Sequence, residues 1–296
     1  MKIFIVSGFL GAGKTTFIQA LSEKTKKQFV IMENEYGETG IDGSLLEKDR
    51  LKVWELTEGC ICCSLKSDFA SSILTIANSL NPEYLIVEPT GVGMLSAVIN
   101  NIRKIEYEHI QVLAPVTIVD IHCMEEYLKT FGNFYKDQIR NASQIILSKT
   151  EEAAPEELIG LRAVLHNLNP QAPIIDSYKS QPIEWWDALL ASSDDRAKKL
   201  IFVEGNQIPD LENVGITDIR IESIEGLVAR LSALMQNRFG TVYRVKGYAP
   251  INGQWARFDV VDKQYKIETC HAMDEAKAIV IGKNLQKDSL KILFRE

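Results

Sequence analysis

The feature that most constrains the fold is the glycine-rich segment GFLGAGKT near the start of the chain. Gly8, Gly13, Lys14 and Thr15 fill the pattern G-x-x-x-x-G-K-[ST], directly after the apolar run 2–7 and before a segment of helical length. A strand, this loop and a helix together make a phosphate-binding P-loop, whose glycines let backbone amides wrap around phosphate groups. The sequence therefore predicts an α/β domain with a mainly parallel sheet and a nucleotide site.

Two side chains of the P-loop carry specific chemistry. Lys14 is expected to reach the terminal phosphates as a cation, and the Thr15 hydroxyl is placed to bind Mg²⁺. The alternative, a glycine-rich turn with an exposed lysine, leaves the flanking strand and helix unexplained. The residues predicted to bind nucleotide in this loop are Gly8, Gly11, Ala12, Gly13, Lys14, Thr15 and Thr16.

Short apolar runs alternate with helix-length segments through the first two thirds of the chain. The predicted strands are 2–7, 29–32, 51–56, 84–88, 112–119, 145–148 and 172–176. The predicted helices are 16–24, 67–80, 125–140 and 156–167. Such alternation predicts a parallel sheet with helices on both faces, so phosphate chemistry belongs at the carboxyl ends of the strands.

A segment rich in charge and chain-breaking residues divides the chain. We predict a P-loop domain over residues 1–200, a linker over 201–215 and a small α+β domain over 216–296. The strands predicted for the last domain are 216–222, 243–248, 256–261, 264–269 and 290–294, and its helices are 224–238 and 276–284. These strands are expected to form an antiparallel sheet.

Charge and hydropathy exclude some classes of partner. The net charge of −7 leaves no basic stripe for a phosphate backbone, so nucleic acid is not an expected partner. No run approaches the roughly 18 uninterrupted apolar residues of a membrane span. The residues after Met1 leave no room for a secretory segment, so we expect a cytoplasmic protein without a membrane partner.

The predicted strand 84–88 ends in the sequence EPTG, at residues 88–91, which looks like a Walker-B and switch element. Glu88 is expected to hold the hydration shell of Mg²⁺ or to orient water, and the Gly91 amide to meet a terminal phosphate. We therefore take Lys14, Glu88 and Gly91 as catalytic candidates. An ordinary strand-end carboxylate is the alternative for Glu88.

The segment SKTE, at residues 148–151, resembles the guanine-reading motif N-K-x-D with two substitutions. The Glu151 carboxylate can accept hydrogen bonds from the ring NH and the exocyclic amine of guanine, whereas adenine offers no matching donors. Lys149 would lay its aliphatic stem along the base. Guanine is favoured, but Ser148 is shorter than asparagine and Glu151 longer than aspartate, so selectivity over ATP is expected to be weaker than usual.

Three of the five cysteines lie within four residues, as Cys60, Cys62 and Cys63. An odd total in a reducing compartment argues against a disulfide framework. Clustered thiolates suit Zn²⁺ and other borderline or soft ions, and three of them leave one position for water, a partner protein or a carboxylate from residues 33–38. Small buried cysteines are the alternative.

The motifs GFLGAGKTT, ENEYGETGID, EGCICC, EPTG and SKTE occur in the order expected for the CobW-like family of P-loop GTPases, which this chain resembles. The resemblance covers most of the chain, because RVKGY at residues 244–248, with Trp255 and Phe258, looks like the start of that family's C-terminal domain. It implies GTP hydrolysis to GDP and phosphate, coupled to delivery of zinc or cobalt to a client metalloprotein. A homodimer is a further partner that the interpretation allows.

The resemblance also assigns residues. The implied ligands of the transition metal are Cys60, Cys62, Cys63 and Glu33. Glu38 and Asp42 would lie in a switch-like segment between nucleotide and metal, and the candidate Mg²⁺ ligands are Thr15, Glu88 and Asp42. The chain lacks the histidine-rich stretch of many metal-handling relatives, which argues against bulk metal storage.

Two other functions stay open on the sequence. One is a nucleotide-dependent regulatory switch that uses the cysteines only for packing. The other is a thiol redox sensor in which the adjacent Cys62 and Cys63 oxidise. Metal content separates the first from metal delivery, and thiol titration with and without Zn²⁺ separates the second.

Overall fold

The chain divides into two compact units, one holding the described residues up to 200 and the other those from 211 on. The computed structural model describes residues 1–33, 51–55, 66–89, 91, 93–107, 109–193, 200, 211–261, 264–273 and 275–295. The first strand of the second unit begins at Glu212, inside the predicted linker 201–215. The domain boundaries themselves stay a prediction.

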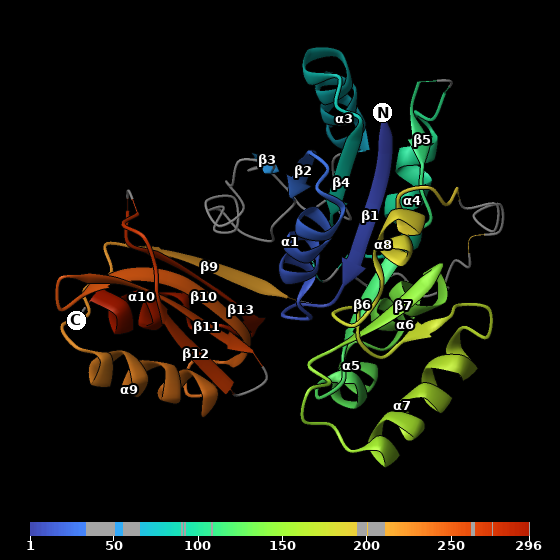
Figure 1. The fold of residues 1–296 in the computed structure, drawn as a ribbon. Helices are drawn as coiled ribbons and strands as arrows, with labels where there is room; N and C mark the ends of the chain where they lie inside the picture. Colours follow the sequence, from blue (N-terminus) through green and yellow to red (C-terminus); the bar gives the residue numbers. More distant parts are fainter. Residues whose placement is uncertain are drawn as a thin grey trace. The chain divides into compact units, whose positions relative to one another are not determined.

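A parallel sheet organises the first unit. Its strands are β1 (Lys2–Gly8), β2 (Phe29–Glu33), β3 (Leu51–Glu55), β4 (Tyr84–Glu88), β5 (Gln111–Val112), β6 (Val116–Asp120), β7 (Gln144–Ser148) and β8 (Ile174–Ile175). They lie in the order β3-β2-β4-β1-β6-β7-β8, with β5 also beside β1, and all the pairs between them are parallel (Figure 1). The predicted parallel sheet is confirmed.

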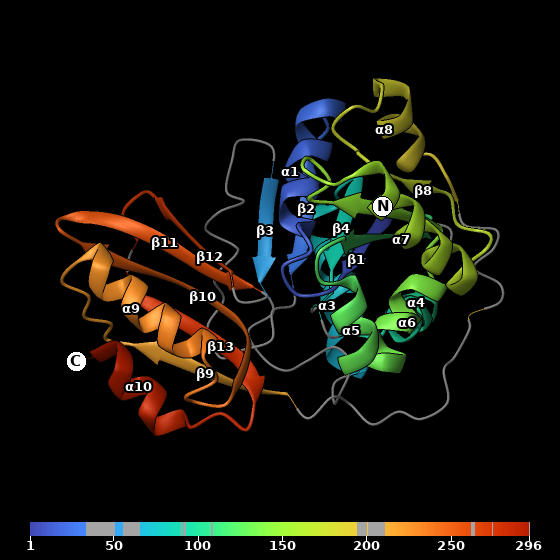
Figure 2. The ribbon, with the colours of Figure 1, turned by 90° about the horizontal axis from the view of Figure 1, so that it is seen from below.

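Helices cover both faces of this sheet. They are α1 (Lys14–Thr25), α3 (Lys66–Leu80), α4 (Leu95–Arg103), α5 (Met124–Thr130), α6 (Gly132–Arg140), α7 (Pro155–Leu168) and α8 (Ile183–Leu189). Alternate residues of β1 enter two cores: Phe4 and Val6 pack with α1 and α8, whereas Ile3 and Ile5 pack with α3 and α4 (Figure 2). Among the described helices, none has the length and apolar character needed to cross a membrane.

Two predicted elements of the first unit are each broken in two. The predicted strand 112–119 is interrupted before β6 at Pro115, which has no amide hydrogen to give to a neighbouring strand. The predicted helix 125–140 breaks at Gly132, whose φ of 43° lies in the left-handed region that glycine tolerates best. The helices α4 and α8 were not predicted.

The second unit is an antiparallel sheet with helices on one face. Its elements are β9 (Glu212–Thr217), α9 (Ile224–Met235), β10 (Thr241–Ile251), β11 (Gln254–Val261), β12 (Gln264–Thr269), β13 (Lys277–Lys283) and α10 (Lys287–Arg295). The strand order is β12-β11-β10-β13-β9 (Figure 1). Leu227 and Leu231 of α9 share a core with Phe258 and Phe294, whose rings stack at 6.0 Å. The predicted α+β class is confirmed.

Two predictions in this unit are wrong in type. Residues 276–284, predicted as a helix, form β13, because the run of β-branched side chains at 279–281 suits a strand and residues 278–282 are all buried. Residues 290–294, predicted as a strand, belong to α10, where the helical spacing of Leu290, Leu293 and Phe294 places them together. The strand predicted at 216–222 lies four residues earlier, as β9.

Candidate nucleotide site

The P-loop joins β1 to α1, as predicted, and close backbone contacts fix its path. A Cβ on Gly8 would lie 2.5 Å from the carbonyl oxygen of Ile118 in β6, so no side chain fits there. Gly13 has a φ of 94° and precedes α1 without any side-chain cap on the helix. A helix start without a side-chain cap favours a phosphate group as an acceptor for its first amides.

The Lys14 side chain lies folded over this loop. Its Nζ donates to the carbonyl oxygens of Gly8, at 3.1 Å, and Phe9, at 3.2 Å. The same ammonium lies 3.8 Å from Oε1 of Glu88, which is the last residue of β4. Both side chains are buried, so the cation and the strand-end carboxylate meet where the helix begins.

The loop that follows β4 packs directly on the P-loop. A Cβ on Gly91 would lie 2.5 Å from the backbone nitrogen of Leu10. Only glycine allows this approach, because real Cβ atoms do not come so near to backbone atoms. The three predicted catalytic residues, Lys14, Glu88 and Gly91, are thereby brought to one place.

The segment SKTE begins beside the P-loop. A Cβ on Gly13 would lie 3.9 Å from Cβ of Ser148, which is ordinary contact distance. The Ser148 hydroxyl donates to the carbonyl of Val119 at 3.3 Å. Lys149 has a φ of 59°, a left-handed conformation that turns the chain sharply after β7. The segments predicted to read the base and to bind the phosphates therefore adjoin.

Asp120 fixes the direction of the Lys149 side chain, and sequence reasoning missed it. The carboxylate is buried at the end of β6 and forms an ion pair with the Lys149 ammonium. It also accepts the backbone amide of His122 at 3.0 Å, and the Cys123 thiol lies 3.5 Å away. The signal that was missed is an acidic residue at the carboxyl end of an apolar strand, the end of the sheet at which the P-loop lies.

Glu151, the predicted guanine acceptor, has a partner of its own. Its Oε1 accepts a hydrogen bond from Nζ of Lys179 at 2.5 Å, and both side chains are more than half exposed. This bond lowers the pKa of Glu151 and raises that of Lys179. The glutamate is thus held as an anion, the form that accepts hydrogen bonds from guanine. Lys179 was not predicted, because it lies 28 residues beyond Glu151.

Most of the predicted ligands of the transition metal lie outside the residues that the structure describes. These are Cys60, Cys62 and Cys63, and the Mg²⁺ candidate Asp42 lies outside the described residues as well. Glu33 is described by its backbone, which ends β2 and pairs in register with Glu88 of β4. Within the described ranges, no three histidine, cysteine or acidic side chains gather into a group that could hold a metal ion.

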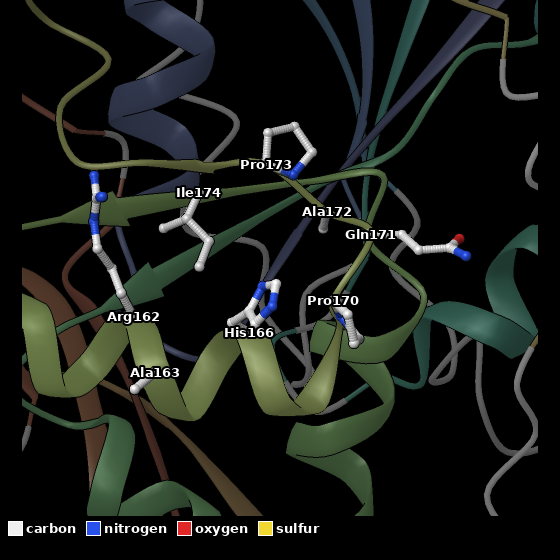
Figure 3. A pocket seen from close by; sticks show the side chains of 8 residues that line it. All are labelled: Arg162, Ala163, His166, Pro170, Gln171, Ala172, Pro173 and Ile174. Carbon is white, nitrogen blue, oxygen red and sulfur yellow. The ribbon is translucent and has the colours of Figure 1, made fainter.

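A separate shallow hollow of about 580 Å³ lies between α7 and β8. Figure 3 shows Arg162 and His166 on the helix opposite Ile174 of the edge strand. Nε of Arg162 donates to Asp176 at 2.7 Å, so its charge is already paired. None of the predicted site residues lines this hollow, and we do not assign the nucleotide to it.

Comparison with known proteins gives family matches over both units. Residues 2–176 match the CobW/HypB/UreG nucleotide-binding domain, and residues 225–296 match the cobalamin synthesis protein cobW C-terminal domain. The zinc chaperone YeiR of Escherichia coli K12 is 30% identical over 155 residues, which cover 51% of this chain and 47% of YeiR. The zinc chaperone YjiA of the same strain is 28% identical over 182 residues, which cover 59% of this chain and 56% of YjiA.

The chain thus spans about half the length of the curated relatives it matches. Among solved structures, Zn(II)-bound YjiA GTPase from E. coli aligns over 99% of this chain and 98% of that chain, with a TM-score of 0.48 and 19% identity. Since the first family match covers residues 2–176 of 296, the chain belongs to the CobW/HypB/UreG nucleotide-binding family.

Proposed function

We propose that the protein hydrolyses GTP to GDP and phosphate, and that hydrolysis governs the binding and delivery of a transition metal to a client metalloprotein. The observation that carries the hydrolytic part is the meeting of the P-loop with the end of β4. Gly91 packs on Leu10 while the Lys14 ammonium lies 3.8 Å from Glu88. Cation, acid and backbone amide are the parts that phosphoryl transfer requires.

Each of these residues has a role in the proposed reaction. The Lys14 ammonium leaves the loop carbonyls and pairs with the terminal phosphates. The full negative charge of a phosphate attracts it more strongly than the partial charge of a carbonyl oxygen. The Gly91 amide donates to the terminal phosphate as that group separates. Glu88 is the proposed acid of the site: it orients the attacking water or holds the hydration shell of Mg²⁺.

The donor set at the start of α1 fits Mg²⁺. The Thr15 hydroxyl and the Glu88 carboxylate offer hard oxygen atoms, which Mg²⁺ prefers, and neither offers sulfur or nitrogen. Thr15 would bind the ion directly and Glu88 through water, with Asp42 as a third candidate from outside the described residues. Bound there, Mg²⁺ would neutralise charge on the phosphates.

Guanine is the base that the segment SKTE favours. Glu151 is ionised and exposed, so it can accept both the ring NH and the exocyclic amine. Asp120 holds the Lys149 ammonium, which directs the aliphatic stem of that lysine along the loop. GTP and GDP are therefore the proposed ligands.

The proposed cargo is zinc, with cobalt as the second candidate. Cys60, Cys62 and Cys63 supply thiolates suited to either ion, and the matched relatives YeiR and YjiA are named zinc chaperones. Glu33, at the sheet edge beside Glu88, is the proposed carboxylate ligand. The proposed partners are a client metalloprotein and a second copy of this chain.

Metal affinity measured in two nucleotide states tests the proposal. Zn²⁺ affinity is measured with a non-hydrolysable GTP analogue and with GDP, for the wild-type protein and for Cys62→Ser/Cys63→Ser. Coupling of about 1 to 3 kcal/mol would make the wild-type affinities differ about 5- to 150-fold. One Zn²⁺ per wild-type chain, lost in the double variant, supports metal handling.

Other outcomes favour the alternatives. GTP hydrolysis without any bound metal would leave a regulatory switch. Cysteines that form a disulfide reversibly but retain no Zn²⁺ would favour a redox sensor. A wild-type protein that releases no phosphate from GTP with Mg²⁺ would contradict the hydrolytic part.

A further inference from the structure

A buried amide on α6 holds the loop that follows β4. Gln138 is fully buried, and its Nε2 donates to the carbonyl oxygens of Gly91, at 3.0 Å, and Gly93, at 2.8 Å. The two carbonyls fix the orientation of the amide, because its flipped form would turn Oε1 towards them. Among the described residues, Oε1 itself has no hydrogen-bond partner.

This loop needs such an anchor. Gly91 and Gly93 lack side chains and have wide conformational freedom, and Pro89 cannot donate a backbone hydrogen bond. The packing of Gly91 against Leu10 fixes how near the loop comes to the P-loop, but not how its peptide groups are turned. The bonds from Gln138 fix the directions of the Gly91 and Gly93 carbonyls and hold both glycines in place beside α6.

Gln138 acts from a well-fixed platform. Its own carbonyl accepts the Thr117 hydroxyl of β6 at 2.8 Å. The neighbouring carboxylate of Asp137 accepts the backbone amide of Ser96, at the start of α4, at 3.0 Å. The Tyr135 ring packs edge-on against the ring of Phe9 in the P-loop, with 5.6 Å between the ring centroids. The helix is thus tied to β6, to α4 and to the P-loop itself.

We infer that Gln138 is a positioning residue for hydrolysis: by holding the carbonyls of Gly91 and Gly93, it keeps Gly91 at the place where its amide meets the terminal phosphate. This inference rests on the proposed GTP hydrolysis. GDP lacks the terminal phosphate, so its binding does not depend on the loop. A merely structural glutamine would instead affect all nucleotides and the stability of the fold alike.

The chain offers a matched control at the C-terminal end of α7. Asn169 is also buried, and its Nδ2 donates to the carbonyls of Ile139, at 2.8 Å, and Ala142, at 2.9 Å. These acceptors lie in the last turn of α6 and in the turn that leads to β7, and neither is in the loop after β4. Asn169→Leu therefore removes the same kind of bond without touching the loop after β4.

The experiment compares Gln138→Met with Asn169→Leu. Methionine keeps the shape of glutamine but leaves both glycine carbonyls without a donor. Single-turnover GTP hydrolysis, GDP affinity and melting temperature are measured for both variants. We expect Gln138→Met to slow hydrolysis about 10- to 100-fold, with GDP affinity within about twofold of the wild type. Asn169→Leu should lower the melting temperature but keep the hydrolysis rate.

Gln138→Asn keeps the experiment decisive if the methionine variant does not fold. It retains the amide but is one methylene shorter, so it reaches at most one carbonyl and should give a smaller loss of rate. Equal rates in Gln138→Asn and wild type would overturn the inference. So would a rate loss in Asn169→Leu that matches Gln138→Met. A wild type that releases no phosphate overturns the proposed function as well, whereas hydrolysis that survives Gln138→Met overturns this inference alone.

Discussion

At the proposed phosphate end of the site, Gly8, Lys14 and Glu88 are buried, whereas at the proposed base end Lys149 and Glu151 are exposed. The phosphate end is built from backbone groups that pack closely, with gaps too small for a single Cβ. The base end is built from the exposed side chains of Lys149 and Glu151, each held by an ion pair. Rigidly placed groups suit phosphoryl transfer. Exposed charged side chains suit recognition of a base that must bind and leave with each nucleotide.

Burial decides how large an effect a substitution has at each end of the site. A buried donor or acceptor that loses its partner costs about 1 to 3 kcal/mol, but an exposed ion pair contributes about 0 to 1 kcal/mol. Substitutions at the phosphate end are therefore expected to stop turnover, and those at the base end to shift preference by modest factors.

Lys14→Ala should have the largest effect. Loss of the cation is expected to slow GTP hydrolysis about 100- to 1000-fold, because charge that develops on the phosphates loses its partner. The measurement is phosphate release at saturating GTP and Mg²⁺. Lys24→Ala, an exposed lysine on the same helix, is the control and should keep the wild-type rate. Turnover retained in Lys14→Ala would remove the contrast between the two ends.

Gly91→Ala should follow in size. The new Cβ would lie 2.5 Å from the Leu10 nitrogen, so the loop must move by about 1 Å, a displacement that can cost about 100-fold in rate. Gly160→Ala is the matched control, since a Cβ there meets nothing and lies on the surface of α7. Rates and melting temperatures of both variants are compared. Wild-type hydrolysis by Gly91→Ala would show that the loop is not part of the catalytic centre.

The phosphate end was also the part most accessible from the sequence. Its motif is local: Gly8 to Thr15 lie in one segment, and the strand before and the helix after are visible in the apolar pattern. Asp120 and Gln138 act across 29 and 47 residues, on Lys149 and Gly91, and no short pattern signals such contacts.

The errors in the predicted secondary structure also arise from contacts between residues that lie far apart in the sequence. The segments that form β13 and α10 are short. Their apolar residues fit both the alternation of a strand and the spacing of a helix, and only burial distinguishes the two. β13 pairs with strands on both sides, β9 and β10, which lie far from it in sequence. Tertiary pairing therefore decided what local propensity left open.

Glu151→Ala should sharpen the comparison by changing preference rather than rate. Removal of the carboxylate leaves two guanine donors without an acceptor, so discrimination of GTP over ATP should fall about 10-fold. Competition between the two nucleotides for binding gives the ratio directly. Glu152→Ala, an exposed neighbour, should leave the ratio unchanged. Unaltered preference in Glu151→Ala would place base reading elsewhere.

Lys179→Ala should have the smallest effect, and its sign can be worked out. The Lys179 hydrogen bond lowers the pKa of Glu151, so the variant should raise that pKa towards its ordinary value. A depressed carboxyl pKa stabilises the fold above the ordinary value, and that contribution is lost as pH falls through the folded pKa. Both side chains are more than half exposed, so solvent screening keeps the change in stability small.

The effect of Lys179→Ala on nucleotide binding depends on pH in the same sense. At neutral pH Glu151 stays ionised without Lys179, so GTP affinity should change by at most about fivefold, which corresponds to about 1 kcal/mol. Under acidic conditions the variant protonates Glu151 earlier than the wild type and should lose GTP affinity at a higher pH. NMR titration of Glu151, together with GTP binding across the acidic range, measures both shifts. Coincident titrations in variant and wild type would mean that the exposed pair is not formed in solution, and that the base end is held by Asp120 and Lys149 alone.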